Sequence, residues 1–159
     1  MIPVTILIAY FSWKGHTETV VKSVTGYLPD AELVRIVPAR TINIAAAGMK
    51  AFFGMRSAIK PVKADLSGID TLVVASPVWA GKVPPFVNEY LESLTGGTGK
   101  PFHVIVEMGG RGDQGAIAAV RTRLERKGMK FISSASTIEK DVDAGTFTGT
   151  VGSFAAGIR

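Results

Sequence analysis

Short apolar runs alternate with amphipathic segments along most of the chain. The apolar runs are rich in Val, Ile, Leu and Phe, a composition that is typical of buried strands. From these runs we predict five strands, near residues 4–10, 32–37, 71–76, 102–108 and 131–138.

The segments between these runs have the period of a helix. Between the first two strands, for example, Val20, Val21 and Val24 fall on one helical face. The same pattern predicts helices over residues 16–27, 83–94, 113–127 and 148–158. Glycines weaken the last of these predictions, because glycine is a poor helix former.

Strands that alternate with helices form a parallel sheet, because each right-handed crossover returns the chain to the same direction. The sequence therefore predicts one α/β domain over residues 1–159, a three-layer, doubly wound, five-stranded parallel sheet in the order 2-1-3-4-5. In this order the first and third strands are neighbours at the point where the winding reverses. We expect a ligand in the crevice at their carboxyl ends.

The turn after the first strand has the composition of an anion-binding loop. It reads SWKGHT over residues 12–17, and a helix that begins near its end presents backbone N–H groups without carbonyl partners. Ser12 and Thr17 add hydroxyl groups, and Gly15 lets the backbone approach a ligand. Lys14 adds a positive charge. Small polar residues before a helix are also ordinary N-caps, and this loop taken alone leaves that alternative open.

The turn after the third strand is also unusual. It reads SPVWAGKVPP over residues 76–85, and its prolines suit the start of the next helix. Two such loops, each at the carboxyl end of a strand, point to one shared ligand.

Composition limits the chemistry of the site. Of the 159 residues, 47% are hydrophobic and 19% are charged, which predicts a well-filled core. The absence of cysteine excludes disulfides, iron–sulfur clusters, thiolate metal sites and a cysteine nucleophile. The carboxylates of the sequence show no clustering suited to zinc beside His16 or His103, so we predict no metal site.

Neither histidine is predicted to be catalytic. His16 lies in the first turn of a helix and is interpreted as a neutral, solvent-facing imidazole, whereas His103 is interpreted as a satisfied residue within a strand. We predict no catalytic side chain. Residues 1–11 lack a basic segment and a cleavage site and are too short to span a bilayer, so we expect a cytoplasmic protein without membrane contact.

The loops resemble those of the flavodoxin-like FMN-binding proteins, a group that includes flavodoxins and NAD(P)H-dependent FMN oxidoreductases. The phosphate loop of this family, T/S-x-T-G-x-T, is matched at Ser12, Gly15 and Thr17, whereas Lys14 departs from it. SPVWAGKVPP is similar to the loop that contacts the flavin ring. A third loop, EMGGRGDQG over residues 107–115, follows the fourth strand, where the family covers the other side of the flavin.

The resemblance implies a flavodoxin-like fold and non-covalently bound FMN. The first loop would hold the phosphate, and the second and third loops would contact the ring. The cofactor-binding residues that it implies are Ser12, Trp13, Lys14, Gly15, His16, Thr17, Pro77, Val78, Trp79, Ala80, Gly81, Met108, Gly109, Gly110, Arg111, Gly112 and Asp113.

Several of these residues have structural alternatives. Trp79 either covers one face of the flavin or packs on the end of the sheet as part of the core. Trp13 either shields the phosphate or ring edge, or only caps its loop. The third loop is either a flavin contact or a plain glycine-rich turn that Asp113 caps.

The implied function is electron transfer, or reduction of quinone-like acceptors, through bound FMN. The partner is then a redox protein or a small-molecule acceptor, and NAD(P)H as donor and a homodimer are left open. A phosphotransfer receiver is excluded because the ends of the first and third strands, at residues 10–12 and 76–77, lack the acidic residues that it requires.

Residues 39–63 are the least defined part of the sequence. Residues 33–64 contain no acidic side chain and several basic ones, and the alternative function is a cofactor-free binding module that uses the basic stretch 35–63. Nucleic acid is not an expected partner, because aromatic and basic residues are hardly interleaved there. The segment forms either a helix with its apolar face on the sheet, or a flap or subunit contact around residues 49–56.

Overall fold

The computed structural model describes residues 3–158 and contains one sheet of five parallel strands. The strands are β1 (Ile6–Tyr10), β2 (Glu32–Arg35), β3 (Thr71–Pro77), β4 (Pro101–Met108) and β5 (Lys130–Ile138). Their order in the sheet is β2-β1-β3-β4-β5, which confirms the predicted order. Every residue of β1 and β3 is buried, whereas β5, at one edge, alternates between half-buried and exposed positions in its first half.

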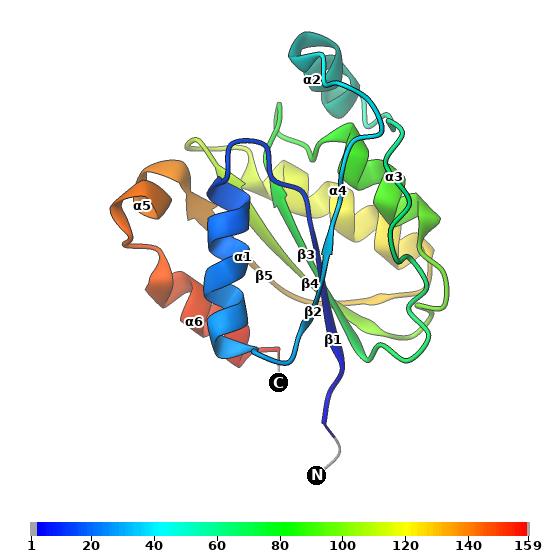
Figure 1. Ribbon diagram of the computed structural model, residues 1–159, viewed down its shortest axis with the longest axis vertical. Helices are drawn as coiled ribbons and strands as arrows, with labels where there is room; N and C mark the ends of the chain where they lie inside the picture. The colour runs from blue at the N-terminus through cyan, green and yellow to red at the C-terminus, as the bar shows by residue number, and fades with distance from the viewer. Residues whose placement is uncertain (1–2, 159) are drawn as a thin grey trace.

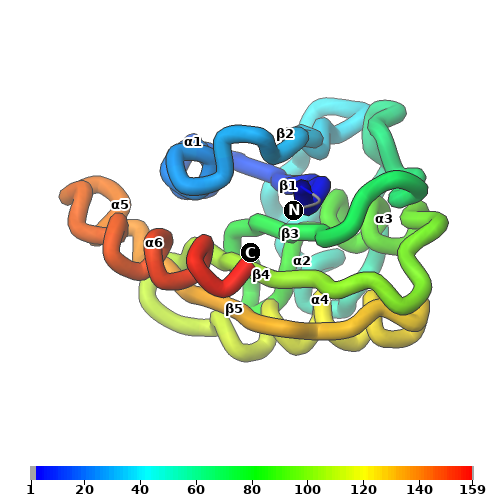
Figure 2. The backbone as a smooth tube through the Cα atoms, turned by 90° about the horizontal axis from the view of Figure 1, so that it is seen from below, coloured from blue at the N-terminus to red at the C-terminus, as the bar shows by residue number. Residues whose placement is uncertain are grey.

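Helices cover both faces of the sheet, so the predicted three layers are confirmed (Figures 1 and 2). The helices are α1 (His16–Tyr27), α2 (Ile44–Phe52), α3 (Pro85–Ser93), α4 (Asp113–Arg126), α5 (Glu139–Ala144) and α6 (Thr148–Ala156). One face packs Ile8 against α1 and α6, through Val24 and Phe154. The other face packs Leu72 against side chains of α3 and α4, such as Tyr90 of α3. No helix within residues 3–158 is both long and apolar enough to cross a membrane.

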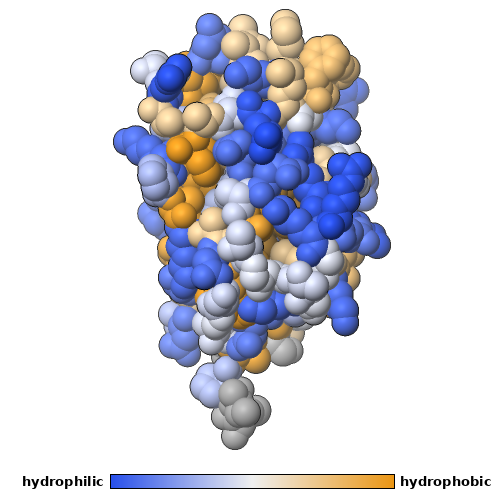
Figure 3. Space-filling model, turned by 90° about the vertical axis from the view of Figure 1, so that its right-hand side faces the viewer, coloured by the Kyte–Doolittle hydropathy of each residue, from blue (hydrophilic) through white to orange (hydrophobic). Residues whose placement is uncertain are grey.

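α2 stands apart from these layers, at the carboxyl edge of the sheet (Figure 1). Only Ala47 and Ala51 of this helix are buried, whereas Met49, Phe52 and the adjacent Phe53 are 59–67% exposed. Figure 3 shows hydrophobic side chains at this upper end of the molecule, above a largely hydrophilic flank. The interpretation of this segment as a helix with its apolar face on the sheet is therefore wrong.

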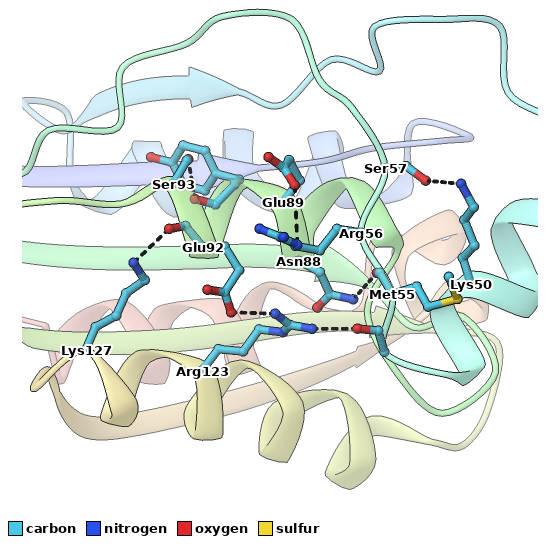
Figure 4. A network of polar contacts seen from close by, with 12 residues as sticks. Lys50, Met55, Arg56, Ser57, Asn88, Glu89, Glu92, Ser93, Arg123 and Lys127 are labelled. Atoms are coloured by element: carbon cyan, nitrogen blue, oxygen red, sulfur yellow. Dashed lines mark hydrogen bonds and ion pairs between the residues drawn. The ribbon is translucent and has the colours of Figure 1, made fainter.

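The segment that follows α2 is anchored by side chains of α3 and α4 (Figure 4). Asn88 donates from Nδ2 to the Met55 carbonyl at 2.9 Å, and Arg123 donates to the Gly54 carbonyl at 2.6 Å. Arg123 also forms an ion pair of 2.6 Å with Glu92. Backbone groups that have left the regular sheet and helices need such partners when they are not fully hydrated. These side chains therefore explain how an irregular crossover keeps a fixed path.

Candidate functional site

The loops after β1, β3 and β4 converge on one cleft of about 210 Å³ at the carboxyl edge of the sheet. The start of α5 closes one side of it. The cleft is lined by Trp13, Lys14, His16, Thr17, Pro77, Val78, Trp79, Glu107, Met108, Gly109 and Glu139. The structure thus brings the turns after the first and third strands together, as the strand order requires.

The floor of the cleft contains the N-terminus of α1. Gly15 is the N-cap residue, with a φ of 95° that favours glycine, and it has no side chain to cap the helix. Ser12 lies just below, where its Oγ accepts a hydrogen bond of 3.2 Å from the Glu18 N–H. The Thr17 hydroxyl is buried and has no hydrogen-bond partner among residues 3–158. Because buried hydroxyl groups are normally paired, this part of the cleft has the donors of an anion site and one unused polar group.

The second loop holds Trp79 in a tight hairpin. Trp79 and Lys82 exchange two backbone hydrogen bonds, of 2.8 and 2.9 Å, around Ala80 and Gly81. Both central residues have positive φ, 51° at Ala80 and 71° at Gly81, as a type I′ turn requires. Alanine is strained in this conformation, because its Cβ approaches the backbone. The surrounding structure has to hold this strained turn in place, and the turn in turn fixes the position of Trp79.

The Trp79 ring packs edge-on against three aromatic neighbours. Its centroid lies 5.7 Å from that of Phe11, 6.4 Å from that of Trp13 and 6.5 Å from that of Phe86. Phe11 is 1% exposed and belongs to the core, so the interpretation of Trp79 as a core-packing residue is confirmed. Trp79 also lines the cleft, and its cover of a flavin face stays a prediction. Trp13 forms the rim of the cleft and is 44% exposed.

The glycines of the third loop serve close packing between loops. At Gly112, which has a φ of 95°, a Cβ would lie 3.0 Å from the Gly81 Cα, and at Gly115 it would overlap the Gly81 carbonyl oxygen. Gly112, not Asp113, is the N-cap residue of α4, so the interpretation that Asp113 caps the turn is wrong. Asp113 instead accepts a hydrogen bond of 2.7 Å from the Ser136 hydroxyl, which holds the pKa of its carboxyl below the ordinary value.

The cleft includes some of the predicted residues and leaves others outside. Those of the predicted set that line it come from the loop before α1 and its first turn, from the second loop up to Trp79, and from the end of β4 with the following Gly109. The predicted residues that do not line it are Ser12, Gly15, Ala80, Gly81, Gly110, Arg111, Gly112 and Asp113. Ser12 and Gly15 shape the start of α1, and Gly81 and Gly112 shape the contact between loops.

Two carboxylates in the cleft were not among the predicted site residues. Glu107, near the end of β4, is 7% exposed, and Glu139 is the first residue of α5. Burial raises the pKa of the Glu107 carboxyl, and the neighbouring His16 partly opposes this shift. An acidic residue inside the apolar run 102–108 was the available signal for Glu107. No comparable signal marks Glu139, because α5 is too short to have a recognisable period.

His16 is drawn into a cluster with α5. Its Nε2 lies 2.8 Å from Asp143 Oδ1 and 3.6 Å from Glu139 Oε1, and its side chain is 18% exposed. The expectation that the His16 imidazole faces solvent is therefore wrong. The expectation that no carboxylates cluster beside a histidine is also wrong. The cluster joins residues 127 positions apart, so spacing along the chain gave no sign of it.

His103 has the predicted structural role. It is 2% exposed, and its Nδ1 lies 2.7 Å from the Ser133 hydroxyl. Burial lowers the pKa of this imidazole. The interpretation of His103 as a satisfied strand residue is confirmed.

Solved structures of other proteins share this architecture. A protein of Bacteroides eggerthii DSM 20697, provisionally assigned as a flavoprotein, is 21% identical and superposes with a TM-score of 0.72, covering 93% of this chain and 98% of its own. A flavoprotein of Lactobacillus acidophilus NCFM, solved in complex with FMN, is 16% identical with a TM-score of 0.70 and coverages of 89% and 98%.

A flavodoxin of Streptococcus pneumoniae TIGR4 is similar over almost the full length of both chains. It is 16% identical, with a TM-score of 0.61 and coverages of 98% of this chain and 97% of its own. No protein-family model and no curated protein sequence matches the chain. Strand order, three layers and these superpositions agree, and the chain has the flavodoxin-like fold.

Proposed function

We propose that the chain binds FMN without a covalent bond and passes electrons through it. The observation that carries this proposal is the buried Thr17 hydroxyl, which has no partner among the described residues and lies in the cleft beside the N-terminus of α1. A phosphate group would accept hydrogen bonds from both. Three flavodoxin-like structures support the same reading by their fold, and one of them contains FMN.

The residues of the cleft fit a phosphorylated flavin in most respects. Lys14 at the rim offers a positive charge, and the N-terminal end of the α1 dipole favours an anion. Trp13 and Trp79 offer flat apolar surface on the side of the cleft away from α5. Glu107 and Glu139 are the exceptions, because carboxylates repel a phosphate.

Bound FMN would supply the reversible uptake of electrons, which no side chain of this chain can perform. The contribution of the protein is to bind, orient and shield the cofactor. The Trp79 hairpin is fixed by its two backbone hydrogen bonds and by its contact with the core, so it would exclude water from one side of the ring. The phosphate end would be held by the first turn of α1.

The finer assignment is electron transfer to a redox partner, or reduction of a quinone-like acceptor, in the cytoplasm. NAD(P)H as donor and a homodimer are compatible with it. The alternative of a cofactor-free module that binds through residues 35–63 has less support. Lys63 pairs with Glu32 at 2.9 Å, and Arg56 pairs with Glu89 at 3.7 Å, so part of that basic charge is neutralised within the chain.

The direct test is the visible spectrum of the purified protein, followed by titration of cofactor-free protein with FMN. We expect flavin absorption bands, release of free FMN on denaturation, and saturable quenching of FMN fluorescence on titration. A colourless preparation that fails to bind added FMN would contradict the proposal. Oxidation of NADH and NADPH in the presence of a quinone then separates a reductase from an electron carrier, because only the reductase turns over.

A further inference from the structure

Glu107 is an unusual side chain for an anion site. It lies on the face of β4 that points toward α1, lines the cleft together with Thr17, and is 7% exposed. Its carboxyl receives no hydrogen bond from any described residue, only charge interactions. A buried carboxylate without donors is costly, and the cost rises when a second negative group enters the same space.

The charged groups that face Glu107 come from two elements. The first loop and α1 contribute Lys14 and His16, and α5 contributes Glu139 and Asp143. His16 Nε2 lies 2.8 Å from Asp143 Oδ1, so this side chain is already engaged by another carboxylate. Lys14 is exposed at the rim. The balance around Glu107 therefore leaves little positive charge to compensate both its own carboxylate and a phosphate dianion.

We infer that Glu107 takes up a proton when a phosphorylated ligand occupies the cleft, and that it thereby sets how strongly the cleft prefers FMN over riboflavin. This inference rests on the proposed function. The step moves one proton from solvent to the Glu107 carboxylate, and no covalent bond of the ligand changes. The neutral carboxyl then has an O–H that can donate to an oxygen of the ligand.

Two features support proton uptake over simple exclusion of the phosphate. Burial raises the pKa of Glu107 and so lowers the cost of protonation, and a negative group in the same space would raise this pKa further. Protonation also removes the repulsion that would oppose the donors at Thr17 and the α1 N-terminus. A carboxyl kept neutral by its surroundings is a known way to obtain a hydrogen-bond donor near neutral pH.

The first experiment counts protons. FMN is titrated into cofactor-free wild-type protein by calorimetry, in buffers with different ionisation enthalpies, at several pH values between about 6 and 8.5. We expect uptake of a fraction of a proton, rising to about one at the pH where free Glu107 is ionised and bound Glu107 is not. Wild-type binding with no uptake at any of these pH values would overturn the inference and leave the FMN proposal intact. Failure of FMN to bind at all would sink the FMN proposal itself.

Matched variants locate the proton. Glu107→Gln keeps the shape of the side chain and is expected to abolish the uptake, whereas Glu139→Gln, in the same cleft but more exposed, is expected to retain it. Uptake that survives in Glu107→Gln, or that disappears equally in Glu139→Gln, would overturn the assignment to Glu107. Circular dichroism and thermal unfolding confirm that each variant is folded.

The second experiment measures ligand preference. Fluorescence titrations at pH 8 compare FMN with riboflavin, which has the same ring and no phosphate. We expect Glu107→Gln to bind FMN about tenfold more tightly than the wild type, because relieved repulsion equivalent to one pKa unit corresponds to a tenfold change in affinity. The affinity for riboflavin should change by less than about twofold. Equal changes for both ligands would show that Glu107 acts on the ring or on the fold, and would overturn its role in phosphate preference.

Discussion

The cleft and the α2 segment occupy the same edge of the sheet but are opposites in their chemistry. In the cleft, the Thr17 hydroxyl has no hydrogen-bond partner within residues 3–158, and the Glu107 carboxyl interacts with its neighbours only through charge. The α2 segment exposes Phe52 and Phe53, and side chains of α3 and α4 donate to the backbone that follows α2 (Figure 4). Under the α2 segment, Asn88 Nδ2 and Arg123 pair with backbone carbonyl groups, whereas Asn88 Oδ1 has no partner among residues 3–158. The comparison teaches that an unpaired polar group points to a ligand only where it faces a cleft, as the Thr17 hydroxyl does.

The largest expected contrast is between two phenylalanines. Phe11→Ala removes a ring that is 1% exposed under Trp79 and should lower the free energy of unfolding by about 3–5 kcal/mol. Phe53→Ala removes a ring that is 67% exposed and should change it by less than about 0.5 kcal/mol. Urea unfolding of both variants measures the difference. A large loss for Phe53→Ala would mean that the α2 surface is covered, for example by a second copy of the chain.

The anchor beneath α2 should be the next most sensitive position. Arg123→Ala removes the hydrogen bond to the Gly54 carbonyl and the ion pair with Glu92, with an expected loss of about 2 kcal/mol. The control is Glu125→Ala, which breaks an exposed pair with Arg121 and should cost about 0.3–0.5 kcal/mol. Similar losses in the two variants by urea unfolding would contradict a specific anchoring role for Arg123.

Thr17→Val separates folding from binding at the cleft. The hydroxyl has no partner among the described residues, so its removal should leave the free energy of unfolding unchanged or raise it by about 1 kcal/mol. The affinity for FMN should fall about tenfold, as for the loss of one hydrogen bond to a charged group. Thr25→Val is the control, since that hydroxyl bonds to the Lys22 carbonyl within α1, far from the loop. A Thr17 variant that unfolds more easily and binds FMN normally would reverse the interpretation.

The Trp79 hairpin offers a smaller test. Ala80→Asn replaces a residue strained at a φ of 51° with one that tolerates this conformation, and should raise the free energy of unfolding by about 0.5–1 kcal/mol. Thermal unfolding measures the gain. The exposed Ala144, within α5, serves as a control for the same substitution, and no gain is expected there. An Ala80 variant that loses stability would show that its side chain has a packing role.

The smallest effect is a pH dependence of stability at Glu107. Its pKa is raised in the folded protein above the ordinary value of 4.5, so the stability that it contributes is present below that value and is lost as the pH rises through the folded pKa. Glu107→Gln should therefore gain stability relative to the wild type at pH 7 and little at pH 4. The buried His103 titrates alike in both proteins, so it cancels from the difference. Urea unfolding at pH 4 and pH 7 that gives equal differences would contradict the shift.

The sequence was sufficient for the features that depend on local pattern. Apolar runs located all five strands, and the period of residues 16–27 located α1 without error at either end. The convergence of the first two loops followed from strand order. Such features need only neighbours along the chain and the general rules for parallel sheets.

The remaining features depend on contacts between distant residues. His16 meets Asp143 only because α5 returns to the start of α1, and the path of the chain after α2 is fixed by hydrogen bonds from Asn88 and Arg123. Glu107 begins the third loop, but its burial depends on α1 and α5. The apolar content of α2 suggested a place on the sheet, and the tertiary structure overrides that local preference.

The contact between Gly81 and the third loop has a consequence for engineering the site. Since a Cβ at Gly112 or Gly115 would press on the hairpin, a loop grafted onto either side has to keep glycine at both positions. The hairpin and the third loop are therefore one packing unit, and the simplest successful graft replaces both loops together.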